Sequence, residues 1–144
     1  MDRPEGTLAL DDQLCFALYA ASRAMTARYR PLLDQIGLTY PQYLVMLILW
    51  QDGPGTVNAL GERLRLDSGT LSPLLSRMQK NGLVDRVRSP ADERSIEIHL
   101  TDEGAALRHR AKTVPKQITD MLGEFDHQAL KQELLDLESL LRLG

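Results

Sequence analysis

The amino-acid sequence predicts a mainly α-helical fold with a small β-hairpin. Apolar residues recur at helical spacing over most of the chain, and one short segment before residue 100 alternates strictly between apolar and polar residues. The 144 residues match the size of one ordinary domain, and their 43% apolar content is sufficient for a hydrophobic core. We therefore expect a single domain over residues 1–144, without separate lobes for a cofactor and a substrate.

Two helices are expected in the N-terminal third. Over residues 11–36 the apolar side chains lie three or four positions apart, and no proline precedes Pro31. Gly37 ends this helix, and Pro41 falls in the first turn of the next, where the missing N–H costs little. The second helix, about residues 41–51, is apolar nearly all round and is therefore expected to be buried.

Two short helices then flank a tight turn. The first is expected over residues 56–64 and the second over about 70–81, with the turn at residues 65–69. The apolar face of the second helix consists of Leu71, Leu74, Leu75 and Met78. Its opposite face is small, polar and basic, which leaves that face available for contact with another molecule.

Residues 83–88 and 94–100 are expected to pair as a hairpin. In the second strand Ile96, Ile98 and Leu100 alternate with polar residues, as in a half-buried strand. The arginines around the loop are Arg86, Arg88 and Arg94. The hairpin therefore carries a basic tip.

The C-terminal third is expected to form two more helices. Thr101 caps a long helix that continues to about Leu122, and Asp126 begins a last one. The last helix carries a leucine stripe made of Leu130, Leu134, Leu137 and Leu141.

The basic charge of the chain is concentrated in one segment. The whole sequence has a formal net charge of −3, whereas Arg63 to Arg88 holds six basic and two acidic residues. Helix, turn, helix and a basic-tipped hairpin are the parts of a winged helix-turn-helix, which binds double-stranded DNA. Lys and Arg contact phosphates, a polar helix face fits the major groove, and a loop-tip arginine fits the minor groove. The candidate DNA-binding residues are Ser68, Thr70, Ser72, Pro73, Ser76, Arg77, Lys80, Arg86, Arg88, Asp92 and Arg94.

Residues 86–104 carry a D-x-R-x-x-x-x-x-L-T-x-x-G pattern. The matching residues are Asp92, Arg94, Leu100, Thr101 and Gly104. This segment resembles the wing signature of MarR-type winged-helix repressors, and the resemblance covers nearly the whole chain. It implies an intertwined homodimer joined by the helices of residues 11–36 and 101–144, with residues 56–100 as the DNA-binding region. A two-fold interface would cover the apolar stripes of these terminal helices.

The N-terminal half is similar to the organic hydroperoxide resistance repressors (OhrR) of that family. The similar parts are residues 10–19, Tyr29 and residues 37–43. The resemblance implies that Cys15 senses the peroxide. It also implies that Tyr29 and Tyr40 reach the sulfur from the other subunit and hydrogen-bond it, with Tyr19 as a further candidate.

Cys15 is the only cysteine, so the chain resembles the one-cysteine type of these repressors. In that type an organic hydroperoxide oxidises the cysteine sulfur, and a low-molecular-weight thiol then reacts with the oxidised sulfur. From the residues alone, a single cysteine on a helix is more often an inert packed side chain. Asp11 and Asp12 nearby also disfavour a thiolate.

Three alternatives remain open. The first is a MarR-type repressor released by a small amphipathic or phenolic ligand, in which Cys15 is structural. The second is a one-cysteine peroxidase, although a wing has no use in such an enzyme. The third is a dimerisation module without a DNA partner, whose polar helix face is simply solvated.

Other sites are not indicated. The three histidines are scattered without Cys or carboxylates at ligand spacing, and no glycine-rich phosphate loop follows a strand. We expect no metal, no cofactor and no enzymatic activity. The first ten residues lack an apolar signal segment, and the longest apolar run has eight residues, so we expect a cytoplasmic protein without a membrane partner.

Overall fold

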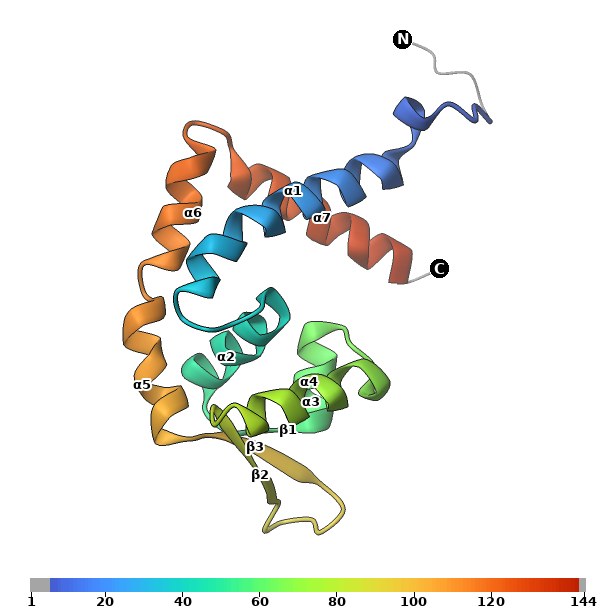
Figure 1. Ribbon diagram of the computed structural model, residues 1–144. Coiled ribbons are helices and arrows are strands. Elements are labelled where there is room, and N and C mark those ends of the chain that lie inside the picture. Colours follow the sequence, from blue (N-terminus) through green and yellow to red (C-terminus); the bar gives the residue numbers. More distant parts are fainter. Residues whose placement is uncertain (1–5, 143–144) are drawn as a thin grey trace. The chain divides into compact units, whose positions relative to one another are not determined.

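Helices dominate the structure, a computed structural model that describes residues 6–142. These residues form two compact units, divided between Lys112 and Thr113. The first unit contains, in chain order, the 3-10 helix η1 (Leu10–Asp12), α1 (Leu14–Asp34), α2 (Tyr40–Asp52), β1 (Gly55–Thr56), α3 (Val57–Leu64), α4 (Ser68–Lys80), β2 (Val84–Arg88), β3 (Ile96–Leu100) and α5 (Asp102–Ala111) (Figure 1). The second contains α6 (Val114–Leu122) and α7 (His127–Arg142). The expected mainly α-helical fold with a small β-hairpin is confirmed.

The N-terminal helices follow the expected caps. α1 begins after the extended Gln13 and continues through Pro31 to Asp34. α2 opens with a capping box, in which Thr39 Oγ1 accepts from the N–H of Gln42 at 3.4 Å and Gln42 Oε1 accepts from the N–H of Thr39 at 3.0 Å. Tyr43, Val45, Met46 and Leu49 of α2 are buried, as its apolar composition predicts. The cap places Tyr40 at the first residue of α2.

The helix-turn-helix is formed by α3 and α4. Arg65 ends α3 in the left-handed conformation, at a φ of 55°. α4 begins at Ser68, two residues earlier than expected, because Asp67 Oδ1 accepts from the N–H of Thr70 at 2.7 Å and so caps the helix. A Cβ at Gly61 would lie 2.9 Å from the carbonyl oxygen of Leu66, so glycine lets the turn pass close to α3.

The sheet has three antiparallel strands in the order β1, β3, β2. Arg86 pairs with Ile98 and Val84 with Leu100, which aligns the expected hairpin in register. Ile98 and Val84 are fully buried. β1 was not expected, because two residues are too short to show an alternating pattern; its Gly55 pairs with Ile98.

The L-T-x-x-G segment joins α2, the end of α4 and the start of α5. The N–H of Thr101 donates to the carbonyl of Leu83 at 3.1 Å, and its hydroxyl donates to the carbonyl of Gly82 at 2.6 Å. The same hydroxyl accepts from the N–H of Gly104 at 3.0 Å, while Trp50 Nε1 donates to the Gly104 carbonyl at 2.9 Å. A Cβ at Gly104 would lie 2.1 Å from the Leu83 oxygen, so this position admits only glycine without a shift of the backbone.

The expectation of one helix over residues 101–122 is wrong. α5 ends at Ala111, and α6 begins at Val114 with Pro115 in its first turn. Pro115 has no N–H to donate to the carbonyl of Ala111, four residues earlier, and its ring would clash with that carbonyl in a continuous helix. The helix therefore breaks between α5 and α6.

Large apolar side chains remain uncovered in each unit. In the first unit several of them lie on the N-terminal half of α1, including Leu14 and Phe16. In the second unit α7 buries none of its residues, and Leu134 and Leu141 of its leucine stripe are 38% and 69% exposed. Within residues 6–142 no helix is long and apolar enough to cross a membrane.

Candidate DNA interface and thiol site

The outer face of α4 is exposed, as the helical pattern predicts. Leu71, Leu75 and Met78 are buried and hold the helix against the first unit. The exposed candidates are Ser68, Thr70, Ser72, Pro73, Ser76, Arg77 and Lys80. The hairpin of β2 and β3 projects beside this helix (Figure 1). One surface therefore presents small polar groups, two cations and a protruding loop.

The tip of the hairpin is held by Asp92. Its Oδ1 accepts from the backbone N–H of Arg94 at 3.0 Å, and its backbone carbonyl accepts from the N–H of Ser95 at 3.0 Å. The carboxylate thus shapes the turn through the backbone N–H of Arg94. Both residues are exposed.

The structure separates the two basic candidates of β2. Arg88 is exposed near the hairpin loop. Arg86 is half-buried, and its Nη2 donates to the carbonyl of Ser72 at 2.9 Å and to the hydroxyl of Ser76 at 3.1 Å. Arg86 therefore faces α4 and not the outer surface.

Cys15 lies in the first turn of α1, and its side chain is exposed. Tyr29 follows it by fourteen residues on the same helix, a separation of about 21 Å along the helix axis. Tyr19 lies one turn after Cys15, but its hydroxyl accepts from Arg23 Nη1 at 3.3 Å and its ring lies 5.5 Å from that guanidinium carbon. Within one chain, Cys15 and Tyr29 are thus not brought together.

Tyr29, Tyr40 and Tyr43 form an aromatic cluster between α1 and α2. The ring centroids of Tyr29 and Tyr40 are 5.0 Å apart, and those of Tyr29 and Tyr43 are 5.9 Å apart. Burial raises the pKa of all three phenols, and burial together with the neighbouring phenols raises the pKa of Tyr43 to about 12. Phenols carry their protons at neutral pH, and burial extends this to higher pH, so these hydroxyls are available as hydrogen-bond donors.

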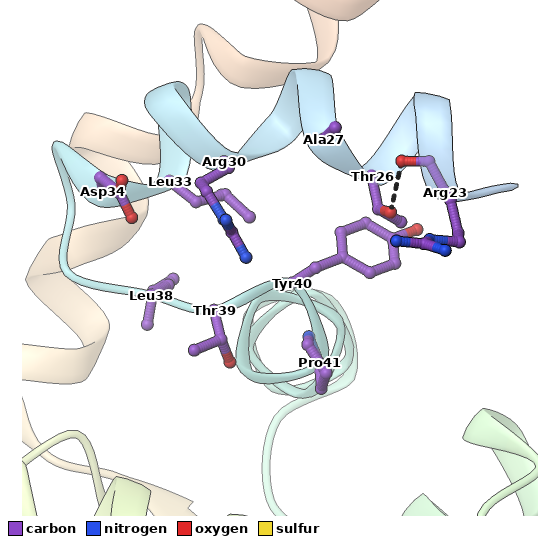
Figure 2. Close-up of a pocket in the computed structure, with 10 residues that line it drawn as sticks. All are labelled: Arg23, Thr26, Ala27, Arg30, Leu33, Asp34, Leu38, Thr39, Tyr40 and Pro41. Atoms are coloured by element: carbon purple, nitrogen blue, oxygen red, sulfur yellow. Dashed lines mark hydrogen bonds between the residues drawn. The ribbon is translucent and has the colours of Figure 1, made fainter.

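A pocket of about 550 Å³ lies between α1 and the start of α2. Figure 2 shows Arg23 and Arg30 reaching from α1 toward Tyr40 and the segment of Leu38 and Thr39. Arg23 and Arg30 were not identified from the sequence as pocket residues. Their spacing of seven residues on one face of α1 was the available signal.

Within residues 6–142 no group of three or more His, Cys, Asp or Glu side chains could hold a metal ion.

Comparison with known proteins agrees with this architecture. Residues 27–110 match the family described as transcriptional regulator SarA/Rot. An organic hydroperoxide resistance transcriptional regulator of Bacillus subtilis (strain 168) is 49% identical over 134 residues, which cover 93% of this chain and 90% of that protein. This chain belongs to the MarR-type winged-helix transcriptional regulators, in the organic hydroperoxide resistance group.

Two further relatives of this MarR-type regulator are a structure bound to DNA and a second transcriptional regulator. The structure of reduced AbfR bound to DNA is 37% identical and has a TM-score of 0.78, covering 92% of this chain and 94% of that one. The HTH-type transcriptional regulator MgrA of Staphylococcus aureus is 45% identical over 100 residues, or 69% of this chain and 68% of that protein. In the regulator described here, α4 is accordingly the recognition helix and the β2–β3 hairpin is the wing.

Proposed function

We propose that this regulator is a redox-sensing repressor. The reduced dimer binds a pseudo-palindromic operator, and oxidation of Cys15 by an organic hydroperoxide releases it. The observation that carries this function is that the single cysteine of the chain is exposed on α1, in a protein 49% identical to an organic hydroperoxide resistance regulator. AbfR offers a parallel, since solved structures exist of its reduced form on DNA and of a disulfide form.

DNA binding follows from the arrangement of the first unit. A two-fold dimer places two α4 helices in successive major grooves, about 10 base pairs apart. Arg94, which is exposed on the hairpin of each chain, then reaches a flanking minor groove. Arg77 and Lys80 lie near the C-terminal end of α4, where they contact phosphates.

The homodimer supplies what a single chain lacks. The uncovered apolar side chains of α1 and α7 need a partner surface. In one chain about 21 Å of helix separates Cys15 from Tyr29. We infer that the phenols that hydrogen-bond Cys15 come from the partner subunit's Tyr29 and the partner subunit's Tyr40. Phenols are protonated at neutral pH, and burial raises the pKa of these two further, so they can donate to an anionic sulfur.

The chemical step is a two-electron oxidation. The Cys15 thiolate attacks one peroxide oxygen, the O–O bond breaks, and the alcohol leaves after taking a proton, which yields a sulfenic acid. A low-molecular-weight thiol then attacks the sulfur, forming a mixed disulfide and releasing water. The adduct is larger than the original thiol, so the helices of the interface must repack. The α4 helices and wings of the two subunits then lose the spacing that the operator requires.

The substitution Cys15→Ser tests the thiol sensor. We expect this variant to bind operator DNA as the wild type does and to stay bound after treatment with cumene hydroperoxide and cysteine. Met25→Leu is the matched control, because Met25 is 37% exposed on the same helix and can also be oxidised. It should be released like the wild type. Mobility-shift assays read the release, and intact mass reads the adduct. Release of Cys15→Ser by peroxide would refute the sensor.

A peroxidase differs from a sensor in stoichiometry. We propose that the regulator is not an enzyme, so that each chain consumes one equivalent of peroxide and then stops. Continued peroxide consumption with excess thiol reductant would contradict this.

The pocket beside Tyr40 favours a second candidate, a repressor released by a small aromatic acid. Its volume of about 550 Å³ is within the range of ligand sites, and Arg23 and Arg30 could pair with a carboxylate. Release of Cys15→Ser from DNA by a benzoate-type ligand, without peroxide, would favour this candidate. Retention of that variant at millimolar benzoate would exclude benzoates as its signal.

A further inference from the structure

Arg86 joins the wing to the recognition helix. On β2 its backbone pairs with Ile98, and its side chain crosses to α4. There Nη2 donates to the carbonyl of Ser72 and to the hydroxyl of Ser76, at 2.9 and 3.1 Å. Its Nε is buried and has no partner within the described chain. Nη2 is engaged by α4 and Nε is buried, so only the two N–H groups of Nη1 are left for a DNA phosphate, although Arg86 was among the candidate DNA-binding residues.

We propose that Arg86 is a positioning residue that orients the hydroxyl of Ser76 for reading a base, and that it makes no contact with phosphate. The proposal rests on the DNA-binding function proposed above. A serine hydroxyl has one hydrogen and two lone pairs. Because one lone pair accepts from Arg86, the hydroxyl hydrogen points away from the guanidinium. Since Ser76 is exposed on the outer face of α4, this hydrogen is available to an acceptor in the major groove.

The major groove offers such acceptors on particular bases. Purine N7, guanine O6 and thymine O4 accept hydrogen bonds, whereas the amino groups of cytosine and adenine donate them. An unconstrained serine can donate to an acceptor edge or accept from a donor edge, because its hydroxyl rotates freely. With Arg86 in place, Ser76 prefers an acceptor. The expected consequence is a preference for one kind of base edge at one position in each half-site.

The surroundings of Arg86 make hydrogen bonds the main link between α4 and the wing at this point. A cavity of about 180 Å³ lies here, lined by Ser72 of α4, Arg86 of β2 and Arg94 of the wing among others. Because this space is open, close packing does not hold the helix to the hairpin there. Loss of the Arg86 hydrogen bonds would free Ser76 without opening a well-packed core.

Arg88 offers a matched control for the test. It lies two residues after Arg86 on the same strand and therefore on the same face, but it is exposed and has no partner within residues 6–142. We compare Arg86→Met with Arg88→Met on a duplex that the wild-type protein selects from a randomised pool. The affinity of each is measured as a function of salt concentration.

The two variants should differ in the slope of log affinity against log salt. Arg86→Met should lose about tenfold in affinity with an unchanged slope, since it removes hydrogen bonds but no phosphate contact. Arg88→Met should reduce the slope by about one, because it removes a phosphate contact. A slope reduced by about one in Arg86→Met would overturn the proposal.

A second measurement uses Ser76→Ala, whose exposed position leaves the fold unaffected. If Arg86 acts through Ser76, the double variant Arg86→Met, Ser76→Ala binds DNA about as well as Ser76→Ala alone. Both single variants then lose selectivity at the same base pair when the selection from the randomised pool is repeated. Additive losses, or an unchanged base preference in Ser76→Ala, would overturn the proposal even if Arg86→Met does not fold. Failure of the wild type to select any duplex would instead refute DNA binding itself.

Discussion

Of the described glycines, Gly104 is the one at which an added Cβ would lie closest to the backbone. In Gly104→Ala, the new Cβ would lie 2.1 Å from the Leu83 oxygen and 3.1 Å from its carbonyl carbon. Real Cβ atoms do not approach closer than 3.0 Å, so the Leu83 carbonyl must retreat by about 1 Å. That carbonyl also accepts from the N–H of Thr101, and the retreat breaks this hydrogen bond.

The expected magnitude combines three contributions. Overpacking of this kind costs about 3 kcal/mol, loss of the hydrogen bond costs about 1 kcal/mol, and the better helix propensity of alanine returns about 1 kcal/mol. We expect Gly104→Ala to lower the free energy of unfolding by about 3 kcal/mol, equivalent to about 10 °C in Tm. Because Leu83 links α4 to β2, the affinity for DNA should also fall.

Thermal unfolding followed by circular dichroism tests this prediction. Samples must have equal protein concentrations, since association shifts the apparent stability. Gly55→Ala is the control, because a Cβ at Gly55 meets no atom within 4 Å. Its Tm should stay within about 3 °C of the wild type. A Gly104→Ala variant that melts like Gly55→Ala would refute the argument from the close contact.

Three other predictions follow from single contacts. Trp50→Phe removes the donor to the Gly104 carbonyl and should cost about 1 kcal/mol in urea unfolding, followed by circular dichroism because Trp50 is the only tryptophan. The raised pKa of Tyr43 stabilises the fold fully below pH 10, and this stability is lost as the pH rises toward 12, since the unfolded phenol ionises first. Tm measured from pH 9 to 11 should therefore fall less steeply in Tyr43→Phe, and parallel profiles would contradict this. Leu134→Glu should shift the dimer toward monomer in sedimentation velocity, whereas Gln132→Glu on the same helix should not.

Local patterns in the sequence were sufficient to predict α3, α4 and the β2–β3 hairpin. The apolar face of α4 and the alternation of Ile96, Ile98 and Leu100 specify which side of each element is buried, because side-chain direction repeats with the backbone period. The same period predicted which face of α4 is exposed. The family was indicated separately, by the resemblance of Asp92, Arg94 and the L-T-x-x-G segment to the MarR wing signature.

Two elements were predicted wrongly or not at all, because the helix-breaking signal of one was outweighed by apolar spacing and the other is too short to show a pattern. Pro115 was visible in the sequence, but the apolar spacing on either side of it was read as one helix. The break after Ala111 follows from the missing N–H and the clash of the ring. β1 has two residues, so no periodicity could reveal it.

The amino-acid sequence by itself determined most of the helices, the hairpin and a single thiol, because each of these follows from residue type and spacing. Only the tertiary structure decided what distant residues do to one another. It turned Arg86 toward Ser76, placed the Leu83 carbonyl against Gly104, and gathered three tyrosines away from Cys15. The physical reason is that such contacts depend on how separate elements dock, and residues 10 to 50 positions apart leave no local pattern of their meeting.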